Sequence, residues 1–296
     1  MPDAPASAPG AAAPGADLPV VVVPVGPDDA ALDACLAALD ASTPAGTRVW
    51  LVDDAVGGPR VRAVVDAWLA RTRLQAGYGR RPAPRGEVAH LDEVLRACGG
   101  DVAVLAPDAR PAAGWLVRMQ RQFAADASIA SLTPWSNAGE TAAFPRLGEC
   151  APLPSQPDAI ARAAADAARA PVELPAAVGH AVLLRGAMLR AVGGLDATTY
   201  RSCYAALIDL SLRMQAFGGR NLLCAQAFVA RGAEGRPADG DLDRLAARWP
   251  HWNAALATFL MRDPLREARD AVAATLARHE AAIATQAELF AEGARA

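Results

Sequence analysis

Apolar, β-branched runs alternate with helix-forming stretches along the first half of this chain, and that alternation constrains its fold more than any other feature. The first run, Leu18-Pro-Val-Val-Val-Val-Pro-Val25, has the continuous apolar character of a strand buried on both faces. A helical pattern over 30–39, a strand over 48–52 and a helix over 61–69 follow it. Parallel strands need such crossover helices between them. We therefore expect an α/β fold with a doubly wound, mostly parallel central sheet.

Composition and pattern divide the chain into three parts. Residues 1–17 have no periodicity and no leader pattern, so we expect a disordered tail. Residues 18–238 are expected to form one domain, with further strands over 101–105, 129–133, 181–184 and 222–230. Within it, 77–86 predicts an irregular loop, Ser155-Gln-Pro-Asp158 a capping box at a helix start, and 207–217 a helix. Residues 239–296 are expected to form a C-terminal helical extension.

Charge and cysteine usage narrow the class of protein. The formal net charge is −3 and every basic side chain is an arginine, so no basic field favours nucleic acid as a partner. Five scattered cysteines without a Cys-x-x-Cys pair, and four scattered histidines, predict neither a disulfide framework nor a zinc site. No stretch approaches the ~20 apolar residues of a membrane span. We expect a cytoplasmic protein without a transmembrane segment.

Carboxylates end several of the predicted elements. Asp53 and Asp54 follow the second strand, Asp108 follows the strand over 101–105, and Asp209 lies near the start of the helix over 207–217. Open α/β sheets bind ligands beyond the carboxyl ends of their strands, so these acids are candidate site residues. Taken one at a time, each such acid is more often a turn former or a helix-capping group than a catalytic residue. Their order and spacing favour a shared site.

The order of these motifs resembles that of the family 2 glycosyltransferases, which have the GT-A fold. The similarity extends over residues 20–264 and rests on six segments in the family's order. These are 20–25, 51–55, 104–116, 133–139, 189–196 and 209–220. The segment 104–116 carries a strand, its acid and a Gly-Trp-Leu helix start. The segment 133–139 looks like the acceptor-side loop of members that build bacterial polysaccharides.

The resemblance implies a nucleotide-sugar site in the first half of the domain. Pro24, Asp53 and Asp54 would hold the base and ribose of the donor, whose hydroxyl and imide groups donate hydrogen bonds. Asp108 would bind Mg²⁺ or Mn²⁺, which bridges the diphosphate and stabilises the leaving nucleoside diphosphate. Trp135 and Asn137 would line an acceptor pocket.

Two departures from the family pattern concern the metal. Ala106 stands where a second acid or an asparagine is common in the family, and Arg231 stands where a histidine is common. Arg231 would belong to the nucleotide-sugar site in either case, because a guanidinium neutralises diphosphate charge as a bidentate donor. A site without a metal therefore stays open.

A third departure concerns the catalytic base. Ala206 and Leu207 replace the acidic pair that includes the family's usual base. Asp209 is the acid that remains in this motif and is the candidate catalytic residue, with helix capping as its alternative role. Glu140 and Asp196 are other carboxylates that could substitute for the missing base.

The resemblance implies inverting transfer of a hexosyl or deoxyhexosyl group from a nucleotide diphosphate sugar to a carbohydrate or lipid-linked acceptor, in bacterial surface polysaccharide biosynthesis. The alternative is a catalytically impaired homologue that acts as a nucleotide-binding or scaffold protein. The C-terminal helices would then bind a partner protein or a second copy. Attachment at the inner face of the membrane also stays open.

Overall fold

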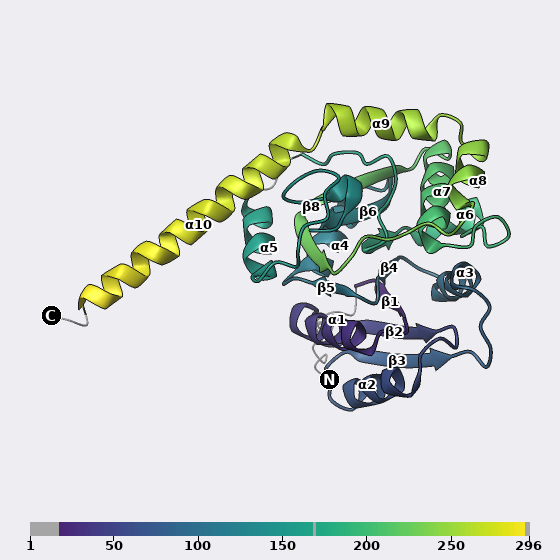
Figure 1. Ribbon diagram of the computed structural model, residues 1–296, viewed down its shortest axis with the longest axis horizontal. Helices are drawn as coiled ribbons and strands as arrows, with labels where there is room; N and C mark the ends of the chain where they lie inside the picture. The colour runs from purple at the N-terminus through teal and green to yellow at the C-terminus, as the bar shows by residue number, and fades with distance from the viewer. Residues whose placement is uncertain (1–17, 168–169, 294–296) are drawn as a thin grey trace, which may run out of the picture.

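A mixed, eight-stranded sheet with helices on both faces forms the centre of the part of the chain that the structure describes. The structure is a computed structural model that describes residues 18–167 and 170–293 (Figure 1). The expected disordered tail, 1–17, lies outside the described residues. The strand order is β3-β2-β1-β4-β7-β6-β8-β5. The strands are β1 (Val20–Pro24), β2 (Arg48–Asp53), β3 (Gln75–Arg80), β4 (Val102–Leu105), β5 (Ala109–Pro111), β6 (Ile129–Trp135), β7 (Ala181–Leu184) and β8 (Arg220–Arg231).

Helices cover both faces of this sheet and continue beyond it at the C-terminal end (Figure 1). They are α1 (Asp29–Ser42), α2 (Pro59–Leu69), α3 (Glu87–Cys98), α4 (Trp115–Ala125), the 3-10 helix η1 (Glu140–Ala142), α5 (Pro157–Asp166), α6 (Gly186–Val192), α7 (Cys203–Ala216), α8 (Asp241–Arg248), α9 (Trp252–Arg262) and α10 (Arg266–Gly293).

The unbroken apolar run of β1 has a simple cause in the packing. Val21 and Val23 belong to the core cluster under α1, α2 and α4, whereas Val20 and Val22 belong to the cluster under α3, α6 and α7. Successive side chains of a strand point to opposite faces, so a central strand between two helical layers must be apolar at every position. The predicted α/β fold with two covered faces is confirmed.

Parallel pairing brings four strand ends to one edge of the sheet. β1 pairs in parallel with β2 and β4, and β2 pairs in parallel with β3. Their carboxyl ends therefore open toward the same side. β7 pairs antiparallel with both β4 and β6, and β5 pairs antiparallel with β8, while β6 and β8 are parallel. The sheet is consequently mixed beyond β4.

The prediction of an irregular loop over 77–86 is wrong for 77–80, which belong to strand β3. β3 runs through Gly77, Tyr78 and Gly79 and is in register with β2, with Trp50 opposite Gly77 and Leu51 opposite Tyr78. Glycine weakens an isolated strand, but here the backbone hydrogen bonds to β2 and the half-buried Tyr78 ring hold an edge strand. Only tertiary pairing could reveal it.

Two predicted helix starts also differ. The prediction of a capping box is wrong. The N-cap residue of α5 is Gln156, which makes no side-chain cap hydrogen bond. The Asp158 carboxylate instead accepts a hydrogen bond from the Ala113 amide at 2.8 Å. Helix α7 begins four residues earlier than predicted, where the Ser202 hydroxyl caps it by accepting from the Ala205 amide. Asp209 therefore lies in the second turn of α7, and its predicted alternative role as the helix cap is wrong.

The last helix extends beyond the body of the protein (Figure 1). Its first turns pack against α5, where Leu265, Ala268 and Val272 are buried. Side chains over 281–286 are exposed, including Ile283 at 61%. Across 18–167 and 170–293, no helix combines the length and apolar character needed to cross a membrane.

Candidate active site

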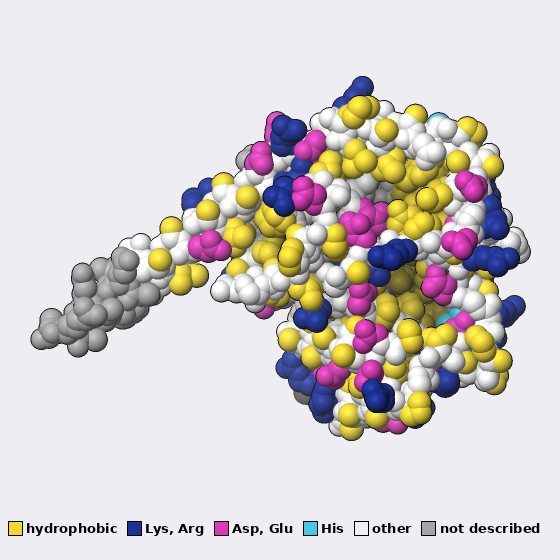
Figure 2. All heavy atoms as spheres, viewed as in Figure 1, with side chains coloured by type: hydrophobic (Ala, Val, Ile, Leu, Met, Phe, Trp, Pro, Cys, Tyr) yellow, Lys and Arg dark blue, Asp and Glu magenta, His cyan; other side chains and the backbone are white. Residues whose placement is uncertain are grey.

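A cavity of about 640 Å³ opens at the shared carboxyl edge of β1, β2 and β4. The segments that follow these three strands form one wall, α3 and α7 form another, and the loop after β8 closes a third side. Figure 2 shows this hollow on the visible face, with hydrophobic side chains inside it and charged side chains around its rim. In open α/β sheets this is where ligands bind, at the point where the strand order reverses.

Pro24 and Asp54 lie on the cavity wall, as a nucleotide site would require. The Asp54 carboxylate accepts hydrogen bonds from the backbone amides of Arg85 and Gly86, at 2.9 and 2.7 Å. Gly86 is the N-cap residue of α3 and has a φ of 98°, a left-handed value that favours glycine. Asp54 therefore fixes the start of the helix that forms one wall of the cavity.

Asp53 stabilises the turn after β2 and does not itself line the cavity. Its carboxylate is buried and accepts hydrogen bonds from the amides of Val56 and Gly57, from the Tyr78 hydroxyl at 2.7 Å and from Arg80 Nη1 at 2.8 Å. Burial alone raises the pKa of a carboxyl group, but these hydrogen bonds outweigh it and lower the pKa of Asp53. All the observed partners of Asp53 are therefore structural.

Asp108 and Arg231 form an ion pair beside the cavity. Arg231 lines the cavity, and its Nε donates to both oxygens of Asp108, at 2.9 and 3.1 Å. The two residues are 123 positions apart in sequence, and the antiparallel pairing of β5 with β8 brings them together, with Ala109 opposite Arg231. The side chains are 24% and 16% exposed, so the pair is accessible from the cavity without being solvated freely.

The predicted acceptor residues, Trp135 and Asn137, lie outside the lining of the cavity. Asn137 brackets the backbone of Arg231, because its Nδ2 donates to the Arg231 carbonyl at 2.8 Å and its Oδ1 accepts from the Arg231 amide at 2.9 Å. Trp135 is fully buried, and its indole N–H donates to the Ala225 carbonyl at 3.1 Å. Neither side chain lines the active-site cavity among the described residues.

The side chains around Asp108 do not fit a resident Mg²⁺ or Mn²⁺. These hard cations need several oxygen ligands. Both Asp108 oxygens already accept from Arg231, and the wall residue two positions earlier is the apolar Ala106. Nowhere in the described residues do three or more His, Cys, Asp or Glu side chains gather as a metal site.

Asp209 lies away from the cavity, inside the α7–α8 packing. Its fully buried carboxylate pairs with Arg213 at 2.8 Å and Arg248 at 3.3 Å, and it accepts from the Trp249 indole N–H at 2.9 Å. Arg213 lies on the same helix, one turn after Asp209. Asp196 is similarly occupied, by Thr198, Thr199 and Arg248, and its pKa is lowered because these hydrogen bonds outweigh burial.

Glu140 is the cavity carboxylate whose chemistry stands out. Burial raises its pKa to about 7, and the nearby Glu234 adds to the shift, while a hydrogen bond from Tyr204 and the charge of Arg231 oppose it. The Tyr204 hydroxyl donates to Glu140 Oε2 at 3.0 Å. The Glu140 backbone has a φ of 50°, which is strained for a residue with a side chain. A carboxyl group that titrates near neutrality in a cavity is suited to general base chemistry.

His90 is a cavity residue that the sequence motifs did not single out. It lies on α3, is 8% exposed, and lines the cavity near Asp54 and Gly86. Neither ring nitrogen has a hydrogen-bond partner among the described residues. Buried polar groups normally have partners, so His90 is a candidate to bind a ligand group. The sequence signal for His90 was its position, one turn after the start of the helix that follows Asp54 and the 77–86 segment.

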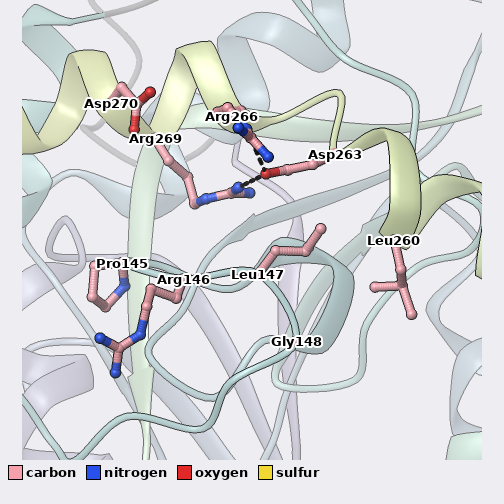
Figure 3. Close-up of a pocket in the computed structure, with 9 residues that line it drawn as sticks. All are labelled: Pro145, Arg146, Leu147, Gly148, Leu260, Asp263, Arg266, Arg269 and Asp270. Carbon is pink, nitrogen blue, oxygen red and sulfur yellow. Dashed lines mark hydrogen bonds and ion pairs between the residues drawn. The ribbon is translucent and has the colours of Figure 1, made fainter.

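A second cavity, of about 610 Å³, has a different lining and a structural character (Figure 3). It lies between the 145–148 loop and the junction of α9 with α10. Asp263, which has a φ of 46°, receives hydrogen bonds there from Arg266 and from the buried Arg269. These contacts position the first turn of α10. The cavity at the strand ends is therefore the candidate active site.

No family model matches the sequence, and no curated protein matches it. Solved structures do match the fold. The mannosyltransferase PcManGT from Pyrobaculum calidifontis, in complex with GDP-Man and Mn²⁺, has a TM-score of 0.58 and 18% identity, covering 95% of this chain and 80% of that chain. GalNAc-T7, with UDP, GalNAc and Mn²⁺, has a TM-score of 0.60 and 14% identity, covering 87% of this chain and 55% of that chain.

A third similar structure is S. aureus TarS 1-349 in complex with UDP-GlcNAc, with a TM-score of 0.55 and 13% identity over 81% of this chain and 71% of that chain. These sequence identities are too low to transfer the roles of individual residues, whereas the structural similarity establishes the fold. The chain has the GT-A fold of glycosyltransferases.

Proposed function

We propose that this protein is a glycosyltransferase that uses a nucleotide-sugar donor. The observation that carries the proposal is the placement of Glu140 and Arg231 on one cavity at the carboxyl ends of β1, β2 and β4. One side chain titrates near neutrality and the other is a cation. Sugar transfer needs both, because a hydroxyl proton must be removed while diphosphate charge is stabilised. The similar structures bind GDP-Man, UDP or UDP-GlcNAc, which supports this donor class.

The nucleoside would occupy the part of the cavity formed by Pro24, Asp54 and His90. Its apolar lining suits a base, and the unpartnered ring of His90 suits a carbonyl or N–H group of that base. Asp53 would act indirectly, by holding the turn that carries Asp54. Trp135 and Asn137 would likewise support the acceptor side through the loop that carries Glu140.

In the proposed reaction, Glu140 accepts the proton of the acceptor hydroxyl. The hydroxyl oxygen attacks the anomeric carbon from the face opposite the leaving group, and the bond from that carbon to the diphosphate oxygen breaks. The nucleoside diphosphate leaves with the bonding electron pair, stabilised by Arg231. One displacement of this kind inverts the anomeric centre. Asp209 has no role in this step, because its carboxylate is held in the α7–α8 packing.

The wider context is part of the same proposal. The motif resemblance favours a hexosyl or deoxyhexosyl donor and a carbohydrate or lipid-linked acceptor in surface polysaccharide assembly. Figure 2 shows the cavity open at the surface, so that a large acceptor could reach it.

Calorimetric titration with UDP, GDP and dTDP tests the donor site, and release of nucleoside diphosphate from the matching nucleotide sugars tests the reaction. We expect one nucleotide to bind and its sugar to be consumed. Glu140→Gln should retain binding but lower turnover by about 100-fold or more. In the wild type, turnover should fall about tenfold per pH unit below about pH 7, because the base must be ionised.

Two outcomes would contradict the proposal in different ways. If none of the nucleotides binds, the donor site does not exist. If a nucleotide binds but no sugar is consumed with any acceptor, and Glu140→Gln behaves like the wild type, the scaffold alternative is favoured. Glu149→Gln is the matched control, because this glutamate lies on the same loop, is exposed and pairs with Arg146.

A further inference from the structure

We infer that Arg231 takes the place of the divalent cation and holds the diphosphate of the donor directly, so that nucleotide binding needs no metal. The inference rests on the proposed function, because it assumes a nucleotide-sugar donor. It opposes the expectation that Asp108 is a metal ligand. The Asp108–Arg231 ion pair at the cavity wall carries it.

The guanidinium of Arg231 donates to the protein through Nε and lines the cavity with the rest of its donors. Its Nε donates to both Asp108 oxygens, at 2.9 and 3.1 Å. Its two terminal nitrogens have no acceptor among the described residues, and the side chain lines the cavity. Two parallel N–H donors on a planar cation match the geometry of two oxyanions. Those terminal donors are therefore available for a diphosphate.

The position of Arg231 is fixed before any ligand binds. Asn137 holds both the amide and the carbonyl of its backbone, at 2.9 and 2.8 Å. Strand pairing places Ala109 opposite it, so the Asp108 side of the pair is held by the same sheet. Gly235 lies beside the terminal nitrogens, where a Cβ would be 3.5 Å from Nη1. A preorganised donor of this kind stabilises developing negative charge without having to reorganise.

The same contacts argue against a cation at Asp108. The guanidinium already compensates the charge of the Asp108 carboxylate, and a metal bound to either oxygen would lie close to this second cation and be repelled by it. Ala106 offers no further oxygen from its side chain. Among the described residues, the cationic side chains that line the cavity are Arg231, at the end of β8, and the exposed Arg236, on the loop that follows.

Titration calorimetry with UDP, GDP and dTDP, in excess EDTA and then in excess Mn²⁺, tests the inference. We expect the dissociation constant of the nucleotide that binds to agree within about twofold between the two conditions. Arg231→Gln should weaken binding in EDTA by about 10- to 100-fold. Asp108→Asn should weaken it by less than about threefold, because it leaves the guanidinium in the cavity.

Controls separate lost binding from lost folding. Arg231→Lys keeps the charge but not the bidentate geometry, and should retain only part of the affinity. Arg146→Gln removes an exposed arginine on the lining of the other cavity and should leave binding unchanged. Circular dichroism melting curves establish that each variant is folded at the titration temperature.

The results distinguish this inference from the proposed function. Binding that occurs only with Mn²⁺, and is lost in Asp108→Asn but retained in Arg231→Gln, would overturn the inference and leave the glycosyltransferase proposal standing. No binding of any nucleotide in either condition would remove the proposed function, and the inference with it.

Discussion

The folded protein disfavours the ionised form of the Glu140 carboxyl group. It combines a positive φ, burial and a neighbouring carboxylate, Glu234, and its pKa rises from 4.5 to about 7. The folded state therefore binds a proton more tightly than the unfolded chain does. Stability from this group is present below about pH 4.5 and is lost as the pH rises toward 7. Such strain is typical of functional positions.

Glu140→Gln should stabilise the protein at alkaline pH. At pH 8, we expect the free energy of unfolding to rise by about 3 kcal/mol, because the amide cannot ionise in the buried site. At about pH 4, where the carboxyl group is protonated in both states, the variant should match the wild type. Urea denaturation at the two pH values measures the difference. An equal effect at both would mean that the carboxyl group is not disfavoured by its site.

At the scale of elements, one buried carboxylate joins two helices. Asp209 on α7 is bound by Arg213 of the same helix, by Arg248 of α8 and by Trp249 just after it. This network attaches the C-terminal helices to the central domain, and explains why an aspartate occupies an otherwise apolar stretch of α7. Removing one member of a buried charge network leaves its partners uncompensated.

Asp209→Asn should therefore lower stability without abolishing nucleotide binding. We expect the free energy of unfolding to fall by about 3 kcal/mol, because Arg213 is left largely buried without its charge partner. Asp166→Asn, at an exposed end of α5, is the control and should change little. Urea denaturation measures stability, and calorimetry at low temperature measures binding. Complete loss of nucleotide binding in a folded Asp209→Asn protein would mean that Asp209 belongs to the nucleotide site.

At the scale of the whole molecule, α10 has two different halves. Its first turns cover α5 with buried apolar side chains, and Asp263 fixes their direction through Arg269 (Figure 3). Its later turns extend away from the body (Figure 1), with exposed side chains over 281–286. Helical stability in proteins comes mainly from such packing, so only the first half should contribute to the folded domain.

Truncation separates the two halves of α10. A chain ending at 280 should keep the melting temperature of the wild type within about 2 °C, because the side chains over 281–286 are exposed. A chain ending at 263 loses Leu265, Ala268 and Val272 and should be at least about 4 kcal/mol less stable. Calorimetry of both chains, with size-exclusion chromatography, measures this. A large destabilisation in the 280 chain would mean that the later turns are covered in solution.

Much of the fold could be predicted from local pattern. The apolar run of β1 and the helices on either side of β2 follow from periodicity, since each strand and helix must bury a defined face. Asp54 at the end of β2 could be placed at the cavity for the same reason. β3 could not, because its glycine-containing sequence forms a strand only through hydrogen bonds to β2.

The sequence by itself determined which residue types stand at the strand ends and on α7, including the missing acids at Ala106 and Leu207. The tertiary structure alone decided their partners. It joined Asp108 to Arg231 across 123 positions, enclosed Asp209 among arginines, and left Glu140 partly desolvated in the cavity. The physical reason is that the charge state and accessibility of a carboxylate depend on neighbours from distant segments, and local pattern carries no information about those neighbours.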